Sequence, residues 1–345
     1  MLRWFGFYVV VFSIGFIILI GVFFSSESQI PVRIQKVPPR KVFIGAWVGD
    51  FWNDNTRTLN TSKLTDFESS IHKKMAIANL FIDWTYLEDP ILLTNLAVVK
   101  QKGWTPMISS NPMFFEKCAK GNLNLYSHIA SGKCDSFLES IAVNLGKHPS
   151  PVLFRFAWEM NLPDMYWSIE SQNSTPKDFI SAWKHMHTVL NKAGATNVSW
   201  VLSFNTSHPK TVPYEKLYPG DDYVDWVAID GYNWGTTQDW SNWADFNAVF
   251  FNSYKELTAI TTKPVMLSEV NSAPDGGDKA AWLKDMLEVQ IPNNYKQINA
   301  IIFFNENKIA GESVDWRISK DVLYVKAVEL GLNNPLYQSN YTDIY

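Results

Sequence analysis

Two glutamates stand at the ends of strand-like apolar runs that lie far apart in the chain. Glu159 follows the run "PVLFRFAW", which begins at residue 151, and Glu269 ends the run "KPVMLSE", which begins at residue 263. A pair of carboxyl groups can split a glycosidic bond, because one protonates the leaving oxygen while the other attacks the sugar or activates water. A lone glutamate at a strand end is more often simply solvated. The interpretation therefore depends on whether the fold brings the two together.

Eight apolar runs rich in Val, Ile, Phe and Trp recur along the chain, and segments with helical periodicity separate them. The runs lack polar alternation, as strands do when a parallel sheet is covered on both faces. One intervening segment, "TPKDFISAWKHMHTVLNKAG", predicts a helix because it begins with Thr-Pro and closes on Gly. The runs begin at residues 41, 75, 103, 151, 197, 224, 263 and 298.

Eight strand-helix units over roughly 300 residues predict an α/β fold, a closed (β/α)8 TIM barrel. No Gly-rich dinucleotide turn follows the first run, which disfavours an open doubly wound sheet. We expect one domain over residues 41–335 and a C-terminal tail over 336–345. Functional groups of such barrels lie at the carboxyl ends of the strands. Glu159 on the fourth strand and Glu269 on the seventh would therefore face one cleft.

Other side chains expected at the same end of the barrel suit sugar binding. The chain has fifteen Trp and fourteen Tyr residues, whose rings stack on sugars while their polar tips bond to hydroxyls. For any single aromatic residue, packing beneath a loop is an equally good interpretation. The predicted substrate-binding residues are Trp158, Asn161, Trp167, Asn205, Asp230, Tyr232, Trp234, Phe303 and Asn305.

The charge pattern disfavours several other classes of protein. The net charge is -4 and the sequence contains no run of basic residues, so we expect no nucleic-acid partner. There is no Gly-Lys phosphate loop and no zinc-type spacing of cysteines and histidines, so we expect neither a cofactor nor a metal.

The amino-terminal segment has a different composition from the rest of the chain. Trp4 to Phe24 are uncharged and follow Arg3, and this length suffices to span a bilayer. No small-residue cleavage motif follows, which favours an uncleaved transmembrane anchor over residues 1–24 rather than a signal peptide. Residues 25–40 would form a stiff polar linker. With Arg3 inside, we expect a membrane-anchored protein whose remaining chain lies outside the cytoplasm, or a secreted one if the segment is cleaved. We also expect a monomer.

The chain has two cysteines, Cys118 and Cys134. In an exported protein they could form a disulfide that closes a short loop, worth about 3 kcal/mol. Two buried free thiols are an equally good interpretation. The sequence leaves both open.

Four segments resemble glycoside hydrolase family 26, the β-mannanase family of clan A barrels. They are "RFAWEMN", "YPGDDYVDWVAIDGYNWG", "KPVMLSEV" and "FFNENKIAGESVDWRI". The resemblance implies that Glu159 is the acid/base, that Glu269 is the nucleophile, and that Tyr232 hydrogen-bonds the nucleophile. Trp158 stands where the family usually has His, and Phe303 where many members have Trp. Because an indole N–H can donate but not accept or ionise, recognition of the sugar nearest the scissile bond should differ.

These features predict a retaining endo-β-glycanase that hydrolyses β-1,4 or β-1,3 linkages of mannan, glucan, xylan or a host exopolysaccharide by double displacement. The alternative is a catalytically inactive barrel that binds polysaccharide during its synthesis or export. Trp158 favours that alternative, and the retention of both glutamates disfavours it. A third interpretation is a barrel enzyme that acts on phosphorylated metabolites, which would bind phosphate with a glycine turn such as Gly276-Gly277. The amino-terminal segment disfavours it, because that segment predicts export.

Overall fold

The computed structural model describes residues 40–341, except for 50–51, 54–55, 113–117 and 119–123. The predicted transmembrane anchor, nearly all of the predicted linker and the last four residues lie outside the described residues. Within the described ranges, no helix is long and apolar enough to cross a membrane.

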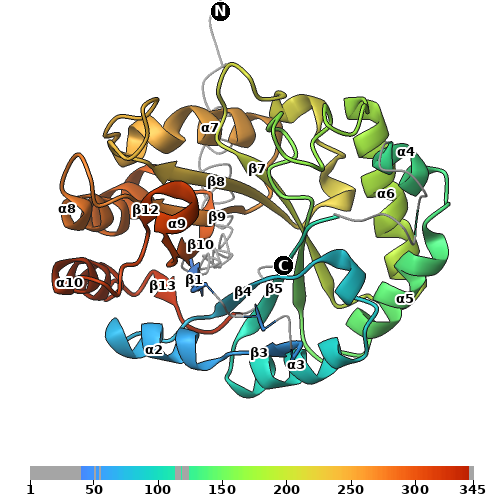
Figure 1. The fold of residues 1–345 in the computed structure, drawn as a ribbon, viewed down its shortest axis with the longest axis horizontal. Helices are drawn as coiled ribbons and strands as arrows, with labels where there is room; N and C mark the ends of the chain where they lie inside the picture. Colours follow the sequence, from blue (N-terminus) through green and yellow to red (C-terminus); the bar gives the residue numbers. More distant parts are fainter. Residues whose placement is uncertain (1–39, 50–51, 54–55, 113–117, 119–123, 342–345) are drawn as a thin grey trace, which may run out of the picture. The chain divides into compact units, whose positions relative to one another are not determined.

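Eight parallel strands form the centre of the fold (Figure 1) and close into a barrel, because the last strand pairs with the first. Each strand overlaps one of the eight predicted runs, so the predicted barrel is confirmed. The strands are β1 (Val42–Trp47), β4 (Ile77–Phe81), β5 (Thr105–Ser110), β6 (Val152–Phe156), β7 (Val198–Asn205), β8 (Trp226–Asn233), β9 (Val265–Ser272) and β10 (Ile298–Phe304).

Helices surround the strands and cover the outside of the barrel (Figure 1). The predicted helix is α6, in which Thr175 and Asp178 form a reciprocal capping box and Pro176 takes the first position. The helices are α2 (Ser62–Ser70), α3 (Ile91–Gln101), α4 (Leu125–Ala130), α5 (Asp135–Gly146), α6 (Pro176–Lys192), α7 (Phe246–Ile260), α8 (Lys279–Asp285) and α10 (Val322–Gly331).

Shorter elements complete the loops. β13 (Tyr337–Gln338) pairs with β1, so part of the predicted tail joins the sheet. The others are the strand pairs β2 (Trp52–Asn53) with β3 (Thr58–Leu59) and β11 (Asn307–Lys308) with β12 (Val314–Asp315), the short helix α9 (Ile309–Glu312), the 3-10 turns η1 (Trp84–Tyr86), η2 (Tyr214–Lys216) and η3 (Asp221–Tyr223), and the π-helix η4 (Met286–Asn294).

Cys118 and Cys134 form a disulfide, with their Cα atoms 4.6 Å apart. The structure therefore decides between the two interpretations that the sequence leaves open. The bond ties the loop after β5 to the start of α5.

The barrel interior changes from apolar to polar along the strands. An inner cluster of apolar side chains includes Ile77, Met107, Leu153, Val201 and Met266. Because strand side chains alternate with a period of two, the residue two positions further along each strand faces inward as well. Those positions hold Asn79, Ser109, Arg155, Ser203 and Ser268, all fully buried. The polar layer thus lies toward the carboxyl ends of the strands.

Candidate active site

Glu159 lies in a turn three residues beyond the end of β6. Ala157 and Glu159 both have a left-handed backbone, with φ of 49° and 56°. The N–H of Ala157 donates to the carbonyl of Ser110 at 2.9 Å, and the N–H of Glu159 donates to the carbonyl of Ser203 at 3.0 Å. A non-glycine residue in this region costs of order 1–3 kcal/mol and is found where the surrounding structure enforces it, often at functional sites. The neighbouring strands β5 and β7 thus fix the direction of Glu159.

The carboxyl group of Glu159 lies in the cleft and is only 7% exposed. Asn205 donates from Nδ2 to Glu159 Oε1 at 2.7 Å. Burial raises the pKa of Glu159 well above its ordinary value, and the negative charges of Asp230 and Glu269 raise it further. Asn205 and Arg155 act in the opposite direction. A carboxyl group in this environment holds its proton at a pH where exposed glutamates have lost theirs.

Glu269 is directed into the cleft by a β-bulge. Between Ile229 and Asp230 the pairing of β8 with β9 shifts by one residue, so that Leu267 opposes Ile229 and Glu269 opposes Asp230. An extra residue in one strand re-aims the side chains around it, which explains how both Ser268 and Glu269 reach the interior. Tyr232 donates its hydroxyl proton to Glu269 Oε2.

Arg155 lies between Asp230 and Glu269, beneath the cleft, and is fully buried. Its guanidinium donates to Glu269 Oε1 at 2.8 Å, to Asp230, and to Ser109 Oγ at 3.0 Å. Arg155 is not among the predicted site residues, although a single arginine inside the apolar run "VLFRF" is a signal in the sequence. A fully buried cation requires an anionic partner, and here it has two.

Asp230 does not contact the cleft, because it is fully buried beneath it. The prediction that it binds substrate is wrong. Besides Arg155, its carboxylate accepts hydrogen bonds from Ser203 Oγ at 3.0 Å and Ser268 Oγ at 2.6 Å. Burial raises the pKa of Asp230 to about 7, against the lowering effect of Arg155. Its place is in the buried charge network.

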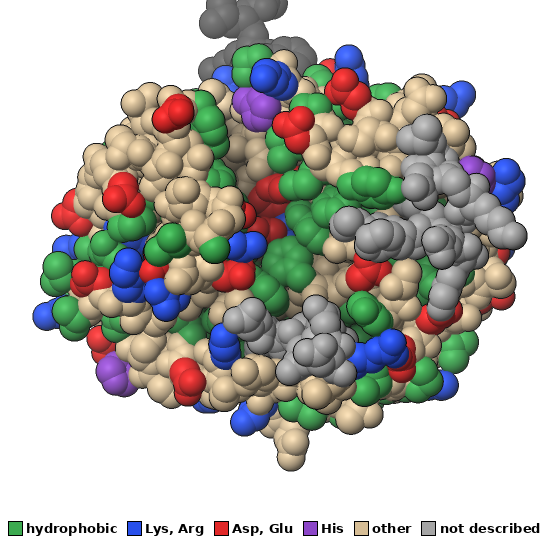
Figure 2. Space-filling model, in the orientation of Figure 1, with side chains coloured by type: hydrophobic (Ala, Val, Ile, Leu, Met, Phe, Trp, Pro, Cys, Tyr) green, Lys and Arg blue, Asp and Glu red, His purple; other side chains and the backbone are tan. Residues whose placement is uncertain are grey.

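The cleft has a volume of about 490 Å³ and is walled largely by aromatic rings. In the orientation of Figure 1, Figure 2 shows a hollow at the middle of this face, with acidic and hydrophobic side chains inside it. The guanidinium of Arg155 lies 5.6 Å from the centre of the Trp158 ring, which shields it from solvent. The cleft is lined by Trp47, Phe81, Trp158, Glu159, Leu162, Met165, Asn205, Tyr232, Trp234, Glu269, Phe304, Glu306, Lys308 and Glu312.

Of the predicted sugar contacts, the structure places Trp158, Asn205, Tyr232 and Trp234 in the cleft. The rest lie behind it. Phe303 is fully buried on the outer face of β10, where it packs against Phe67. The prediction that it stacks on sugar is wrong by one residue, since alternation turns Phe304 toward the cleft instead.

The other three misplaced contacts support cleft residues or loops. Asn161 is fully buried and both donates to the carbonyl of Asn205 at 3.1 Å and accepts from its N–H at 2.9 Å. Trp167 donates from Nε1 to the carbonyl of Trp158 at 2.7 Å. Asn305 accepts from the N–H of Ile318 at 2.6 Å. None of these three side chains is among the residues that line the cleft, and each bonds to the protein instead, so the structure places them in supporting positions.

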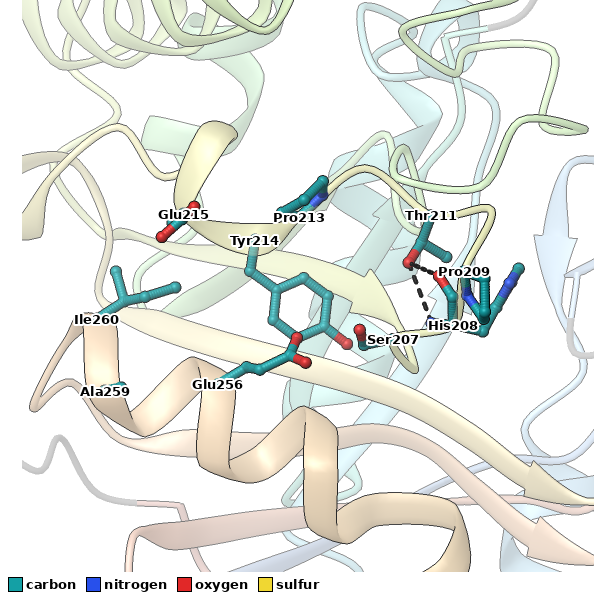
Figure 3. A pocket seen from close by; sticks show the side chains of 10 residues that line it. All are labelled: Ser207, His208, Pro209, Thr211, Pro213, Tyr214, Glu215, Glu256, Ala259 and Ile260. Atoms are coloured by element: carbon teal, nitrogen blue, oxygen red, sulfur yellow. Dashed lines mark hydrogen bonds between the residues drawn. The ribbon is translucent and has the colours of Figure 1, made fainter.

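A second pocket, of about 560 Å³, lies on the flank of the barrel between the loop after β7 and helix α7 (Figure 3). Its two carboxylates belong to Glu215 and Glu256, which are both exposed. Solvated carboxylates of this kind lack the buried environment that tunes an acid for catalysis. In the described part of the chain, no group of three His, Cys, Asp or Glu side chains could hold a metal ion.

The fold and the pair of glutamates are those of barrels that cleave glycosidic bonds. The family model described as Glycosyl hydrolase family 26 matches residues 126–303, just over half of the 345 residues. The chain therefore belongs to glycosyl hydrolase family 26. The matched segment contains both Glu159 and Glu269.

Two relatives align with different shares of the chain. Endoglucanase H of Acetivibrio thermocellus is 31% identical over 307 residues, which make up 87% of this chain and 32% of that protein. The mannan endo-1,4-beta-mannosidase of Bacillus subtilis is 31% identical over 132 residues, 37% of this chain and 32% of that protein. The chain thus spans about a third of the length of its first relative. The solved structure of a Bacillus subtilis mannanase shares the fold, with a TM-score of 0.61, 20% identity, and coverage of 90% of this chain and 89% of that one.

Proposed function

We propose that the protein is a retaining endo-β-glycanase that hydrolyses β-1,4 or β-1,3 linkages of mannan, glucan or an exopolysaccharide. One observation carries the proposal: Glu159 and Glu269 line the same cleft in different electrostatic surroundings. Glu159 is buried with a raised pKa, while Glu269 accepts hydrogen bonds from the Arg155 guanidinium and the Tyr232 hydroxyl. Where two carboxyl groups of one site lie in different environments, the one with the raised pKa usually acts as the acid and the other as the nucleophile.

In the first step, an oxygen of Glu269 forms a bond to the anomeric carbon while the glycosidic bond breaks. Glu159 gives its proton to the leaving oxygen. Tyr232 keeps its own proton, because burial and the charge of Glu269 raise its pKa. Its hydroxyl therefore remains a donor to Glu269 throughout. Arg155 keeps Asp230 as a partner when Glu269 loses its charge.

In the second step, Glu159 removes a proton from water, whose oxygen attacks the anomeric carbon and releases Glu269 as a carboxylate. The charge network explains how one residue can act first as an acid and then as a base. The negative charge of Glu269 is one of the causes that raise the pKa of Glu159. That charge disappears when Glu269 becomes an ester, so the pKa of Glu159 falls when a base is needed.

The names of the relatives support a polysaccharide substrate, since one is an endoglucanase and another a mannan endo-mannosidase. The test is reducing-sugar release from a panel of mannan, mixed-linkage glucan, β-1,3-xylan and cellulose, with the Glu269→Ala variant as control. Release by the native chain, and its loss in the variant, supports the proposal. An inverted anomer in the first product, measured by proton NMR, contradicts the retaining mechanism.

The alternative function is a catalytically inactive barrel that binds polysaccharide. It would need neither a strained turn at Glu159 nor a bulge at Glu269, yet both are present. Affinity electrophoresis on the same polysaccharides separates the two functions. Retarded migration of a native protein that releases no reducing sugar would favour the alternative.

We further infer that the protein is monomeric and anchored in a membrane by residues 1–24, with the barrel outside the cytoplasm. The uncharged segment from Trp4 to Phe24 supports the anchor. The disulfide between Cys118 and Cys134 supports an oxidising compartment. Fractionation of cells tests this. Recovery of the full-length protein in the soluble fraction, trimmed near residue 26, would instead indicate a cleaved signal peptide.

A further inference from the structure

Trp240 has an exposure unusual for its type, with 69% of its surface in contact with solvent. Its ring centre lies 5.4 Å from that of Trp234, which lines the cleft. Trp234 in turn lies 6.0 Å from Tyr232, the partner of Glu269. Three aromatic rings therefore lead from the site of the reaction to the surface.

The loop that carries Trp240 is held in a defined shape by hydrogen bonds at both ends. Thr237 Oγ1 donates to the carbonyl of Trp234 at 2.7 Å, and Ser241 Oγ donates to the carbonyl of Gly235 at 2.8 Å. The N–H of Thr236 donates to the carbonyl of Asp275 at 3.2 Å, which fixes the loop to the one after β9. Trp240 is thus presented by an ordered loop.

The same loop reaches the rim of the cleft. Gln238 Nε2 donates to the carbonyl of Glu312, which is itself a lining residue, at 2.5 Å. Trp316 also connects the two, because its ring lies 5.0 Å from Trp234 and its Nε1 donates to Glu312 at 3.3 Å. The indole of Trp240 is therefore continuous with the wall of the cleft rather than an isolated surface residue.

An exposed indole contributes little to folding, since the gain from apolar surface requires its removal from water. Exposed aromatic surface beside a groove is instead typical of a binding site. A pyranose ring offers an apolar face of C–H groups that covers an indole, and its hydroxyls stay in water. Asp239, the neighbour of Trp240 in the chain, is exposed, and its carboxylate can accept hydrogen bonds from such hydroxyls.

We propose that Trp240 is the stacking platform of an additional sugar subsite, which extends the cleft beyond Trp234 and binds a unit of the β-linked glycan remote from the bond that is cleaved. The inference rests on the proposed function. It assigns to this chain a preference for long glycan chains, because only a glycan that extends past Trp234 also contacts Trp240.

The test measures binding without turnover, in a Glu269→Ala background, by calorimetry with manno- and gluco-oligosaccharides of three and six units. We expect Trp240→Ala to raise the Kd of the longer ligand about three- to tenfold. The effect on the shorter ligand should be clearly smaller, and Trp240→Phe should restore most of the affinity. Phe251→Ala is the matched control, since Phe251 is 53% exposed on α7 and does not line the cleft.

Three outcomes overturn the subsite. These are an unchanged Kd for the longer ligand, an equal loss for both lengths, or the same loss in Phe251→Ala. Failure of the proposed function has a different signature. The native chain then releases no reducing sugar from any polysaccharide, whether or not the Glu269→Ala parent binds oligosaccharides.

Discussion

The guanidinium of Arg155 donates to Glu269 at 2.8 Å in a part of the barrel that excludes solvent almost completely. The same group also pairs with Asp230. One cation thus stabilises two carboxylates, while Glu159 nearby is left to carry a proton. This arrangement separates the two glutamates chemically although they share one cleft.

We expect Arg155→Met to destabilise the barrel by about 3–5 kcal/mol, because it leaves the buried carboxylates of Asp230 and Glu269 without their cation. Urea denaturation at pH 7 measures the free energy of unfolding. Adding Asp230→Asn to Arg155→Met should recover part of the loss, since it removes one of the uncompensated charges. If the free energy of unfolding of Arg155→Met lies within 1 kcal/mol of that of the native protein, solvent or protonation compensates those carboxylates and the prediction is wrong.

Tyr232→Phe removes the phenol hydrogen bond to Glu269. We expect kcat to fall about 100-fold, as for loss of one preorganised donor at a reacting oxygen. Steady-state kinetics on the best polysaccharide of the panel measures the effect. Tyr218→Phe is the matched control, because it deletes a hydroxyl that bonds to Asp221 and Thr261, neither of which lines the cleft. A similar loss in both variants would show that the effect is one of general packing.

The barrel was predictable from the sequence because strands buried on both faces appear as apolar runs, and segments with helical periodicity lie between these runs. The placement of Glu159 and Glu269 followed from the topology alone. The bulge in β9 and the left-handed turn at Ala157 were not predictable, since both depend on hydrogen bonds between strands distant in sequence.

The errors among the sugar contacts have a common physical cause. Alternation along a strand means that a shift of one residue exchanges the inside and the outside of the barrel. Phe303 and Phe304 illustrate this, because their types are identical and only the register decides which one faces the cleft. Asp230 was predicted in the cleft but lies beneath it, since the sequence does not show how deeply solvent enters the barrel from the carboxyl ends of the strands.

Glu159 should make stability depend on pH. Its folded-state pKa lies well above the 4.5 of an ordinary glutamate. The stability that follows from a raised pKa is complete below the unfolded pKa and is lost as the pH rises through the folded one. We therefore expect the native protein to lose stability as the pH rises from about 4.5 through the folded pKa of this group. Glu159→Gln should be less sensitive and more stable than the native protein at pH 8. Thermal unfolding between pH 4 and 8 measures this, and parallel pH profiles for the two proteins would contradict it.

Trp158→His should alter sugar preference without abolishing turnover. The indole lines the cleft beside Glu159 and can only donate a hydrogen bond, whereas imidazole can also accept one and ionise. We expect the ratio of kcat/KM between mannan and glucan to change about tenfold, as single pocket contacts commonly do. The Tm of the variant serves as the folding control. An equal loss on every substrate, with the fold intact, would show that Trp158 only supports Glu159 and Arg155.

Glu159→Ala separates the two steps of the proposed mechanism. On an aryl oligosaccharide whose phenolate leaves without protonation, Glu269 can still attack, so the first step should stay fast. The second step lacks its base and should become slow. We therefore expect a burst of phenolate release followed by slow turnover, and a glycosyl ester on Glu269 that mass spectrometry of a proteolytic digest can detect.

Azide needs no deprotonation and should restore turnover of Glu159→Ala with a product of retained configuration. Glu269→Ala should show neither the burst nor the ester, because it lacks the nucleophile. A slow release without a burst in Glu159→Ala, together with an inverted product from the native chain, would instead assign Glu269 as a base that activates water.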